Sequence, residues 1–287
     1  MLTIFACPKP FTDPHIAMIQ GNAIRSWTLL KPAPTVVLFG NEEGIAEAAR
    51  DIGVQHIEHA AQNERGAPIL SDVFSRAEQT ADSHILCYVN ADIILLQDFV
   101  ETIGTVQNQT DRFMMGGRPW NIRVNEPLQF QPGWADPLRA EVASNGELRG
   151  EYACDYFAYP RGVWGALPDF LLGRGGFDNG LMYLARRRGL ALVDATASVT
   201  AIHQHHGYPK GLGPATYTEH PDSLQNTRLA GGLGCLYSWR YATHRVDNGV
   251  ATMDWNGYSL HWRTRLQQEL WFPLRAATKP IRRMLAK

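Results

Sequence analysis

The stretch ILCYVNADIILLQDF, residues 85–99, places an aspartate inside an otherwise apolar run. A continuous apolar run of this length is typical of a strand that is buried on both faces, as in a parallel sheet. A charge in the middle of such a strand costs a large free energy unless it is paired or bound to a metal. We therefore expect Asp92 to lie where the strand leaves the sheet, where it either caps a turn or holds a ligand.

The first hundred residues repeat a pattern of strand, loop and helix. Strands are predicted at 2–7, 35–40, 54–57 and 85–89, and helical patterns at 14–30, 43–53, 68–81 and from 98 onward. Asp13 with Pro14 is a helix start signal, Gly53 a helix end, and Asp98 with Glu101 resembles a capping box. This alternation predicts an α/β fold with a mostly parallel central sheet and helices on both faces. In such sheets ligands bind at the carboxyl ends of the strands.

The composition fits one large domain, or one domain with an appendage. The 287 residues are 45% hydrophobic and 19% charged, and the formal net charge is -1. Such a balance gives no overall attraction for nucleic acid or for an anionic membrane. We expect no leader peptide and no membrane span, because no segment reaches the roughly 18 apolar residues that a span needs. The four cysteines are far apart, which favours reduced thiols and a cytoplasmic protein.

Two general nucleotide-binding motifs are missing from the sequence. No GxGxxG follows the first strand, and GxxxxGK[ST] occurs nowhere, so that neither a dinucleotide fold nor a P-loop is predicted. Bound phosphates would then need another group to compensate their charge. A divalent metal ion held by Asp92 would do so by bridging two phosphates as a diphosphate leaves.

The second half of the sequence contains further groups that are typical of a site. Asp178 lies in a glycine-rich turn before a helix, and it either caps that helix or takes part in the chemistry. The predicted strand ASVTAIH, residues 197–203, ends in His203, His205 and His206. Three histidines within four residues at a strand exit indicate a metal site, or a solvated loop with hydrogen bonds.

Taken together, these segments resemble bacterial nucleotide-sugar glycosyltransferases of the GT-A fold. The resemblance rests on the order of elements and on YVNADIIL (88–95), DYFAYPRG (155–162), GRGGFDNGLMYLAR (173–186) and VDATASVTAIHQHHGY (193–208). It implies a glycosyltransferase domain over residues 1–210, with a nucleotide-binding half at 1–97 and an acceptor or catalytic half at 98–210. Residues 211–287 would form a C-terminal extension.

The resemblance implies a metal ion and its ligands. In this fold a DxD-type turn ends the nucleotide-binding half, and its last carboxylate, here Asp92, binds Mn2+ or Mg2+ on the sugar-nucleotide diphosphate. His203 or His206 would complete the metal site, and a mixed His and Asp site favours Mn2+. The first position of the turn is Asn90 rather than an aspartate. Its amide offers an oxygen without a charge, which would weaken the metal affinity.

The resemblance also places the nucleotide base at the loops after the first and second strands. Pro8 lies in the first loop, and Asn41, followed by Glu42 and Glu43, lies in the second. In related enzymes an acidic residue at the second place accepts the N–H of uracil, so that a UDP-sugar is the expected donor. The sequence leaves open which of the three residues makes this contact.

Asp178 is the candidate for the catalytic base. The acceptor hydroxyl must lose a proton while negative charge builds on the departing diphosphate. In inverting members of the fold a carboxylate at a helix start is the base, and Asp178 matches that place. The helix N-terminus would keep it ionised near neutral pH, as a weak base. We therefore predict an inverting hexosyltransferase, with a retaining transferase as the alternative.

Other polar and aromatic residues are candidates for substrate contacts. Asp155 either binds the acceptor or is a buried partner of Arg161 or Arg174, and Arg174 is also a candidate for a phosphate contact. Trp120 and Trp134 either stack on acceptor sugars or pack in the core. Both lie in an irregular segment, residues 118–150, of the kind that forms functional loops.

Other functions are compatible with parts of this pattern. A sugar nucleotidyltransferase shares the fold and the metal, but it normally carries a Gly-rich, Arg-containing loop after the first strand, which ACPKPFTDP is not. A metal-dependent hydrolase would need further ligands such as HxHxD or HExxH. A non-catalytic sugar-binding protein would need neither Asp92 nor Asp178. The expected partners are a nucleotide-sugar donor and a glycan or lipid-linked acceptor, without nucleic acid.

The C-terminal segment combines an apolar stripe with basic charge. The stripe consists of Trp262, Leu266, Leu270, Leu274, Ile281 and Leu285. Seven Lys or Arg stand against one Glu between Arg263 and Lys287. A basic amphipathic helix of this kind predicts a peripheral contact with the anionic inner face of the membrane, near a lipid-linked acceptor. Packing of the stripe on the enzyme's own core or on a second subunit is the alternative.

Overall fold

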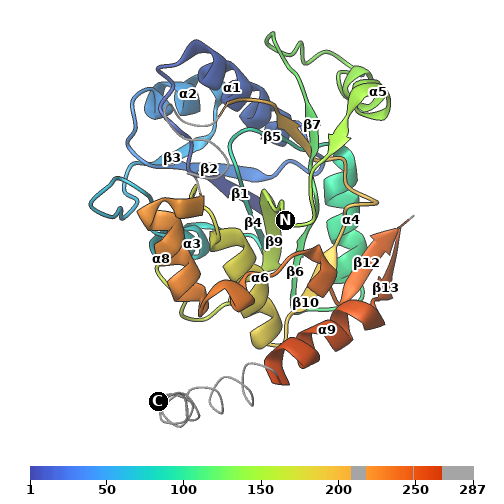
Figure 1. Cartoon of the computed structure of the whole chain (residues 1–287). Helices are drawn as coiled ribbons and strands as arrows, with labels where there is room; N and C mark the ends of the chain where they lie inside the picture. Colours follow the sequence, from blue (N-terminus) through green and yellow to red (C-terminus); the bar gives the residue numbers. More distant parts are fainter. Residues whose placement is uncertain (208–217, 248, 267–287) are drawn as a thin grey trace.

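A nine-stranded sheet forms the centre of the protein, for which a computed structural model describes residues 1–207, 218–247 and 249–266 (Figure 1). The strand order is β13-β12-β10-β6-β9-β4-β1-β2-β3. The strands are β1 (Leu2–Ala6), β2 (Thr35–Phe39), β3 (Gln55–Ile57), β4 (Ile85–Val89), β6 (Phe113–Gly116), β9 (Tyr156–Pro160), β10 (Ala191–Asp194), β12 (His244–Asp247) and β13 (Val250–Met253). The run from β3 through β2 and β1 to β4 is parallel, as are β6, β10 and β12, whereas β9 is antiparallel to its neighbours β4 and β6. The predicted α/β fold with a mostly parallel sheet is confirmed.

A small second sheet joins distant parts of the chain. Its order is β5-β11-β7-β8, formed by β5 (Ile93–Ile94), β11 (Ile202–Gln204), β7 (Trp120–Ile122) and β8 (Glu147–Leu148). β11 is antiparallel to β5, and His203 lies opposite Ile93 in the register. This pairing brings the histidines of the C-terminal half beside the end of β4.

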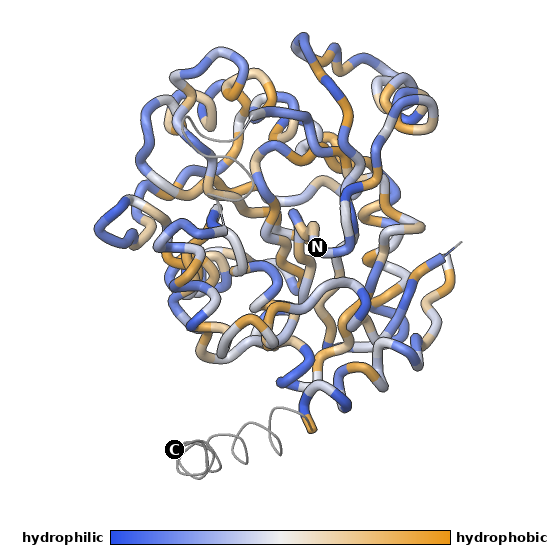
Figure 2. Tube along the Cα trace, in the orientation of Figure 1, coloured by the Kyte–Doolittle hydropathy of each residue, from blue (hydrophilic) through white to orange (hydrophobic). Residues whose placement is uncertain are grey.

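Helices cover both faces of the large sheet (Figure 1). One face carries α1 (Pro14–Thr28), α2 (Ile45–Ile52) and α4 (Gln97–Gln107), and the other carries α3 (Leu70–Thr80), α6 (Phe177–Arg187) and α8 (Pro221–Ala230). The described part also contains α5 (Ala135–Asn145), α9 (Trp255–Leu266) and the 3-10 turns η1 (Leu233–Cys235) and η2 (Trp239–Tyr241). Figure 2 shows the apolar residues along the central strands and the hydrophilic ones mainly in the outer loops.

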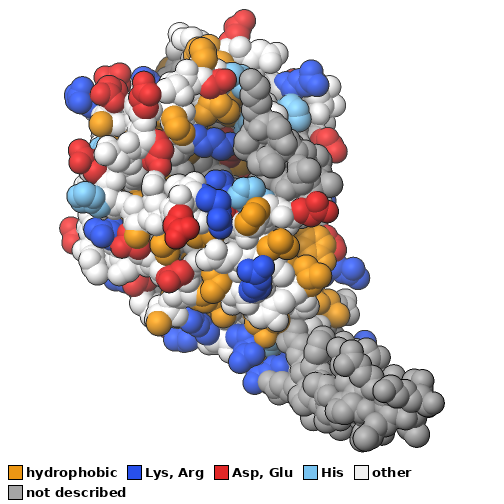
Figure 3. Space-filling model, turned by 60° about the vertical axis from the view of Figure 1, so that its left-hand side comes forward, with side chains coloured by type: hydrophobic (Ala, Val, Ile, Leu, Met, Phe, Trp, Pro, Cys, Tyr) orange, Lys and Arg blue, Asp and Glu red, His pale blue; other side chains and the backbone are white. Residues whose placement is uncertain are grey.

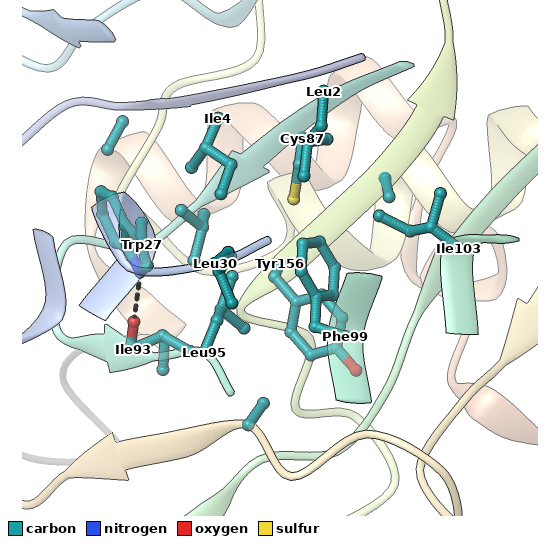
Figure 4. Close-up of a cluster of buried hydrophobic side chains, with 14 of the residues drawn as sticks. Leu2, Ile4, Trp27, Leu30, Cys87, Ile93, Leu95, Phe99, Ile103 and Tyr156 are labelled. Atoms are coloured by element: carbon teal, nitrogen blue, oxygen red, sulfur yellow. Dashed lines mark hydrogen bonds between the residues drawn. The ribbon is translucent and has the colours of Figure 1, made fainter. Parts of the chain in front are cut away.

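The central strands divide the core into two layers, because successive side chains of a strand point to opposite faces. Ile4 and Cys87 pack in the layer under α1 and α4, whereas Phe5 and Tyr88 pack in the layer under α3 and α6. Figure 4 shows the first layer, in which the indole N–H of Trp27 donates to the carbonyl of Ile93 at 2.8 Å. This bond anchors α1 to the segment that follows β4.

Two of the predicted helix signals are confirmed and one is wrong. The Asp13 carboxylate accepts the backbone N–H groups at the start of α1, and Gly53 ends α2 in a left-handed conformation. The capping box at Asp98 does not form, because α4 begins after Leu96 without a side-chain cap. The Asp98 carboxylate instead accepts bonds from the Arg139 guanidinium at 2.8 Å and the Thr200 N–H at 3.2 Å.

Two irregular regions differ from expectation. The segment 118–150 contains β7, α5 and β8, because α5 has too weak an apolar pattern for recognition from sequence and buries only Leu138 and Val142. The strand predicted at 197–203 is limited to β11, since a turn occupies residues 196–198. Beyond residue 210, β12 pairs with β10 in the large sheet and α8 packs on α6. The extension thus shares the sheet and core of the first 210 residues.

The C-terminal stripe lies mostly outside the described residues. Only Trp262 and Leu266 of the predicted stripe belong to α9. In the described part of the chain, we find no helix with the length and apolar character that a bilayer crossing requires.

Candidate functional site

The turn after β4 carries the aspartate that interrupts the apolar run. β4 ends at Val89, and the N–H of Ile93 donates to the carbonyl of Asn90 at 3.0 Å, which closes the turn. The side chain of Asp92 is 15% exposed. Asp92 therefore lies where the strand leaves the sheet, as its cost of burial within a strand predicts.

Two histidines face the carboxylate of Asp92. Nε2 of His206 lies 2.8 Å from Oδ2 of Asp92, and Nε2 of His203 lies 3.8 Å from the same oxygen. The possible ligand atoms of the three residues all lie within 4.8 Å of one another. His205 does not belong to this group, which we call the Asp92 cluster (Asp92, His203 and His206).

The second ring nitrogen of each histidine is held by an acceptor. Nδ1 of His203 lies 2.6 Å from Oδ1 of Asn121, and Nδ1 of His206 lies 2.8 Å from the carbonyl oxygen of Gly207. Because these oxygens only accept, both Nδ1 atoms carry a proton. Each Nε2 is therefore the atom presented to Asp92, as in histidines that bind metals through one nitrogen and are oriented through the other.

Further observations indicate that the Asp92 cluster suits a divalent cation. Oδ1 of Asp92 is buried without a hydrogen-bond partner among the described residues, although a buried carboxylate oxygen is costly to leave unpaired. Two imidazole nitrogens and a carboxylate suit Mn2+ better than Mg2+. Burial tends to raise the pKa of Asp92, but the hydrogen bond from His206 and the neighbouring His203 charge lower it to about 2. A ligand oxygen is thus ionised at any physiological pH.

Asn90 does not face the Asp92 cluster with its amide oxygen. Its Nδ2 donates to Oδ1 of Asp155 at 2.9 Å, and its Oδ1 accepts from the hydroxyl of Tyr88 at 3.2 Å. An aspartate at position 90 would face Asp155 with like charge, which explains the amide at the first position of the turn. The other oxygen of Asp155 accepts from Arg149 at 2.7 Å. The predicted pairing of Asp155 with Arg161 or Arg174 is therefore wrong.

A cavity of about 580 Å³ opens at this end of the sheet, a size that suits a small-molecule ligand. Of the predicted site residues, it is lined by Pro8, Asn90, Asp92, Asp155, Arg174, His203 and His206. Figure 3 shows a hollow on this side of the molecule with basic and histidine side chains near it. The structure thus brings together residues from both halves of the sequence.

The loop after β2 places Glu42 rather than Asn41 in the cavity. Asn41 is exposed outside the lining, whereas Glu42 belongs to it and accepts a bond from Nε2 of Gln62 at 2.8 Å. Gly40 makes this possible, because its φ of 115° suits glycine and a Cβ there would lie 2.2 Å from Oε2 of Glu42. Of Asn41, Glu42 and Glu43, Glu42 is thus the residue that lines the cavity.

Asp178 lies in the first turn of α6, beside the cavity rather than in its lining. The N-cap is Gly176, and the Asp178 carboxylate accepts the N–H of Asn179 at 2.9 Å. Burial, together with the nearby charge of Asp155, raises the pKa of Asp178 to about 7. The expectation that the helix N-terminus keeps Asp178 a weak base is therefore wrong, because desolvation outweighs the helix dipole.

Arg174 lines the cavity, but the two tryptophans do not. Arg174 donates through Nε to Asp222 at 3.3 Å and through Nη1 to the carbonyl of Gly173 at 3.2 Å. Trp120 and Trp134 pack against the small core cluster between β7 and α5. Their contacts support the core alternative for both residues.

Sequence reasoning missed several polar residues of the cavity. Lys9 lies in the loop that follows β1, and a basic residue in a loop at the carboxyl end of a strand was a usable signal. Arg149 lines the cavity through its bond to Asp155, and no local pattern marked it. Asn121 enters the lining only because β7 pairs with β11, which the sequence did not predict.

Comparison with known proteins supports the fold assignment. No protein-family model and no curated protein sequence matches the chain. Among solved structures, glucosyl-3-phosphoglycerate synthase from Mycobacterium tuberculosis is similar, with 17% identity, a TM-score of 0.51 and 81% coverage of each chain. The same enzyme in complex with phosphoglyceric acid gives 13% identity and a TM-score of 0.50, over 82% of this chain and 80% of that one. The chain therefore has the mixed α/β fold of the GT-A glycosyltransferases, with its large, mostly parallel sheet.

Proposed function

We propose that this protein is a metal-dependent glycosyltransferase that moves a sugar from a nucleotide-diphosphate sugar, a UDP-sugar in particular, to a hydroxyl of a glycan or lipid-linked acceptor. The observation that carries the proposal is the Asp92 cluster at the carboxyl end of β4, at the wall of a cavity in a GT-A fold. A divalent ion bound there would neutralise charge on the departing diphosphate.

The residues around the cavity then have distinct tasks. Asp92, His203 and His206 hold the metal, preferably Mn2+, and Glu42 accepts an N–H of the base beside Pro8. Asn90 keeps Asp155 in place, and Asp155 holds Arg149 toward the acceptor side. These contacts support binding of donor and acceptor in one cavity.

Transfer requires one bond to form and another to break. The acceptor oxygen bonds to the anomeric carbon, the bond from that carbon to the phosphate oxygen breaks, and the nucleoside diphosphate leaves with the electron pair. Asp178 takes the acceptor proton, for which a pKa of about 7 is well suited. The proposed mechanism is thus an inversion with Asp178 as base, and a retained anomeric configuration would favour the alternative.

A thermal-shift panel tests the proposed function. We expect UDP-glucose or another UDP-sugar to raise the melting temperature in the presence of Mn2+ and to have little effect after chelation with EDTA. GDP and CDP, and their sugars, complete the panel and report the base. A nucleotidyltransferase would respond to nucleoside triphosphates instead, and a sugar-binding protein would respond to free sugars without metal. Either result would contradict the proposal.

A peripheral membrane contact is the second part of the proposal, and α9 supports it. The helix buries Gly257 and His261 and exposes a stripe of Trp255, Tyr258, Trp262 and Leu266, which are 70%, 39%, 45% and 54% exposed. The guanidinium of Arg265 lies 5.5 Å from the ring centroid of Trp262. Exposed aromatic residues beside arginines are typical of elements that enter the interface of an anionic membrane.

Liposome flotation tests the contact through α9. We expect the full chain to float with anionic vesicles and to be released by added salt, and the double variant Trp255→Ser/Trp262→Ser to remain in the soluble fraction. Leu229→Ser, which removes an exposed apolar side chain from α8, is the matched control and should float like the wild type. The membrane contact would be refuted if the wild-type chain did not float with the vesicles, or if it formed dimers through α9 in solution.

A further inference from the structure

A buried carboxylate outside the cavity holds two segments of the cavity wall. Asp222 lies in the first turn of α8, and its side chain is 0% exposed. One oxygen accepts from Nε of Arg65 at 2.7 Å and from Nδ2 of Asn63 at 2.9 Å, and the other accepts from Nε of Arg174 at 3.3 Å. The backbone N–H of Asp222 donates to Nδ1 of His220 at 3.2 Å.

The partners of Asp222 belong to two adjacent segments of the cavity wall, which are joined by the bond from the N–H of Leu172 to the carbonyl of Pro68 at 2.9 Å. Asn63 also accepts the N–H groups of Arg65 and Ala67, and the same loop supplies Gly66 and Pro68 to the cavity lining. Arg174 is itself part of the lining. Asp222 therefore lies behind the wall and fixes both parts of it.

The charges at Asp222 do not cancel. Burial tends to raise the pKa of Asp222, but the bonds from Arg65 and Asn63 lower it below its ordinary value, so the carboxylate is ionised. Two guanidinium groups share this single carboxylate. Among the described residues, Arg174 uses only Nε and Nη1 in hydrogen bonds, so that Nη2 remains for a ligand.

We propose that Asp222 is a positioning residue that holds the guanidinium of Arg174 against the cavity, where Arg174 binds a phosphate of the nucleoside-diphosphate donor. The inference rests on the proposed function, because it assumes that a nucleoside diphosphate occupies the cavity. Arginine suits this task, since its planar guanidinium bonds the carboxylate on one edge and a phosphate on another.

The sign of the effect distinguishes positioning from simple charge. Asp222→Asn removes a negative charge close to the cavity. If Asp222 acted only through its charge, binding of an anion would become tighter in this variant. If Asp222 holds Arg174 in place, the guanidinium is released and binding becomes weaker.

Calorimetric titration with UDP and with uridine, both with Mn2+, tests the proposal. We expect Asp222→Asn to weaken UDP binding about tenfold and to leave uridine binding unchanged, because only UDP contacts Arg174. In an Arg174→Gln background, Asp222→Asn should have no further effect on UDP. Arg65→Gln is the matched control: it removes the other arginine from the same carboxylate, and UDP should bind as to the wild type.

Several results would overturn the inference. Equal weakening of UDP and uridine would show that Asp222 only supports the fold, and unchanged or tighter UDP binding would exclude positioning. If circular dichroism shows that Asp222→Asn does not fold, Arg174→Lys replaces it, because lysine keeps the charge but lacks the two-edged geometry. That variant should also lose UDP affinity and not uridine affinity, and an unchanged affinity refutes the role. A wild-type chain that binds no nucleoside diphosphate would instead refute the proposed function itself.

Discussion

Asp92→Ala is expected to abolish metal-dependent binding of the sugar nucleotide while the protein remains folded. Asp92 is the one carboxylate of the cluster, and Nε2 of each histidine lies near the same oxygen, Oδ2. Its removal leaves two neutral ligands and no compensating charge, so that the affinity for Mn2+ should fall by about a hundredfold or more. A titration of free Mn2+ by electron paramagnetic resonance, with and without UDP, measures the loss.

Two further variants are compared with Asp92→Ala: one with a smaller expected loss of metal affinity and one control with no expected loss. Asn121→Ala removes the acceptor that orients His203, and metal affinity should fall about 10- to 100-fold, the range for outer-shell partners. Asp98→Asn is the control. It also removes one negative charge, but Asp98 lies outside the cavity lining, so the affinity for Mn2+ should not change. A normal Mn2+ dependence in Asp92→Ala would remove the cluster from the proposed site.

The fold could be predicted because its strongest signals are local. The apolar runs at β1, β2 and β4 are buried on both faces, and a run of that kind has few other structures available to it. The position of Asp92 followed from the same argument, since the cost of burying a charge excludes the strand interior. Local physical chemistry thus decided both the central strands and the end of the sheet at which the cavity opens.

The partners within the site could not be predicted, because they depend on pairings between distant segments. Asp155 bonds Arg149 across a turn that carries no pattern, although Arg161 and Arg174 lie in segments with clearer patterns. Trp120 packs in a small core that exists only because β7 pairs with β11. Tertiary contacts of this kind leave no periodic trace in a single sequence.

The misjudged ionisation of Asp178 shows the same limit in electrostatic terms. The helix N-terminus was visible in the sequence, and it lowers the pKa of a carboxylate. The burial of that carboxylate and the approach of Asp155, which directly precedes β9, were not visible, and they raise the pKa. Desolvation exceeds the dipole of a helix end when a carboxylate is largely removed from water.

Asp178→Asn is expected to reduce turnover by about a hundredfold or more and to leave donor binding nearly unchanged. The amide has the size of the carboxylate but cannot take the acceptor proton. Steady-state kinetics with a UDP-sugar and calorimetric titration with UDP separate the two effects. Asp136→Asn, the same change at the second position of α5, is the matched control and should keep full turnover. Near-normal turnover with a lower melting temperature in Asp178→Asn would make Asp178 a structural residue.

The pH dependence gives Asp178 a second, independent signature. A base must be deprotonated, so that kcat/KM of the wild type should rise with pH through about 7 and then level off. Stability should change in the opposite direction. Between the ordinary carboxylate pKa and about 7, the folded state keeps a proton that the unfolded state has lost, and the free energy of unfolding therefore decreases as pH rises through this window. Asp178→Asn cannot titrate, so its stability relative to the wild type should increase from about pH 4 to pH 7 and stay constant above. A stability difference that does not vary with pH would show that the carboxylate of Asp178 is not desolvated, and would leave the proposed base without the property that suits it to proton transfer.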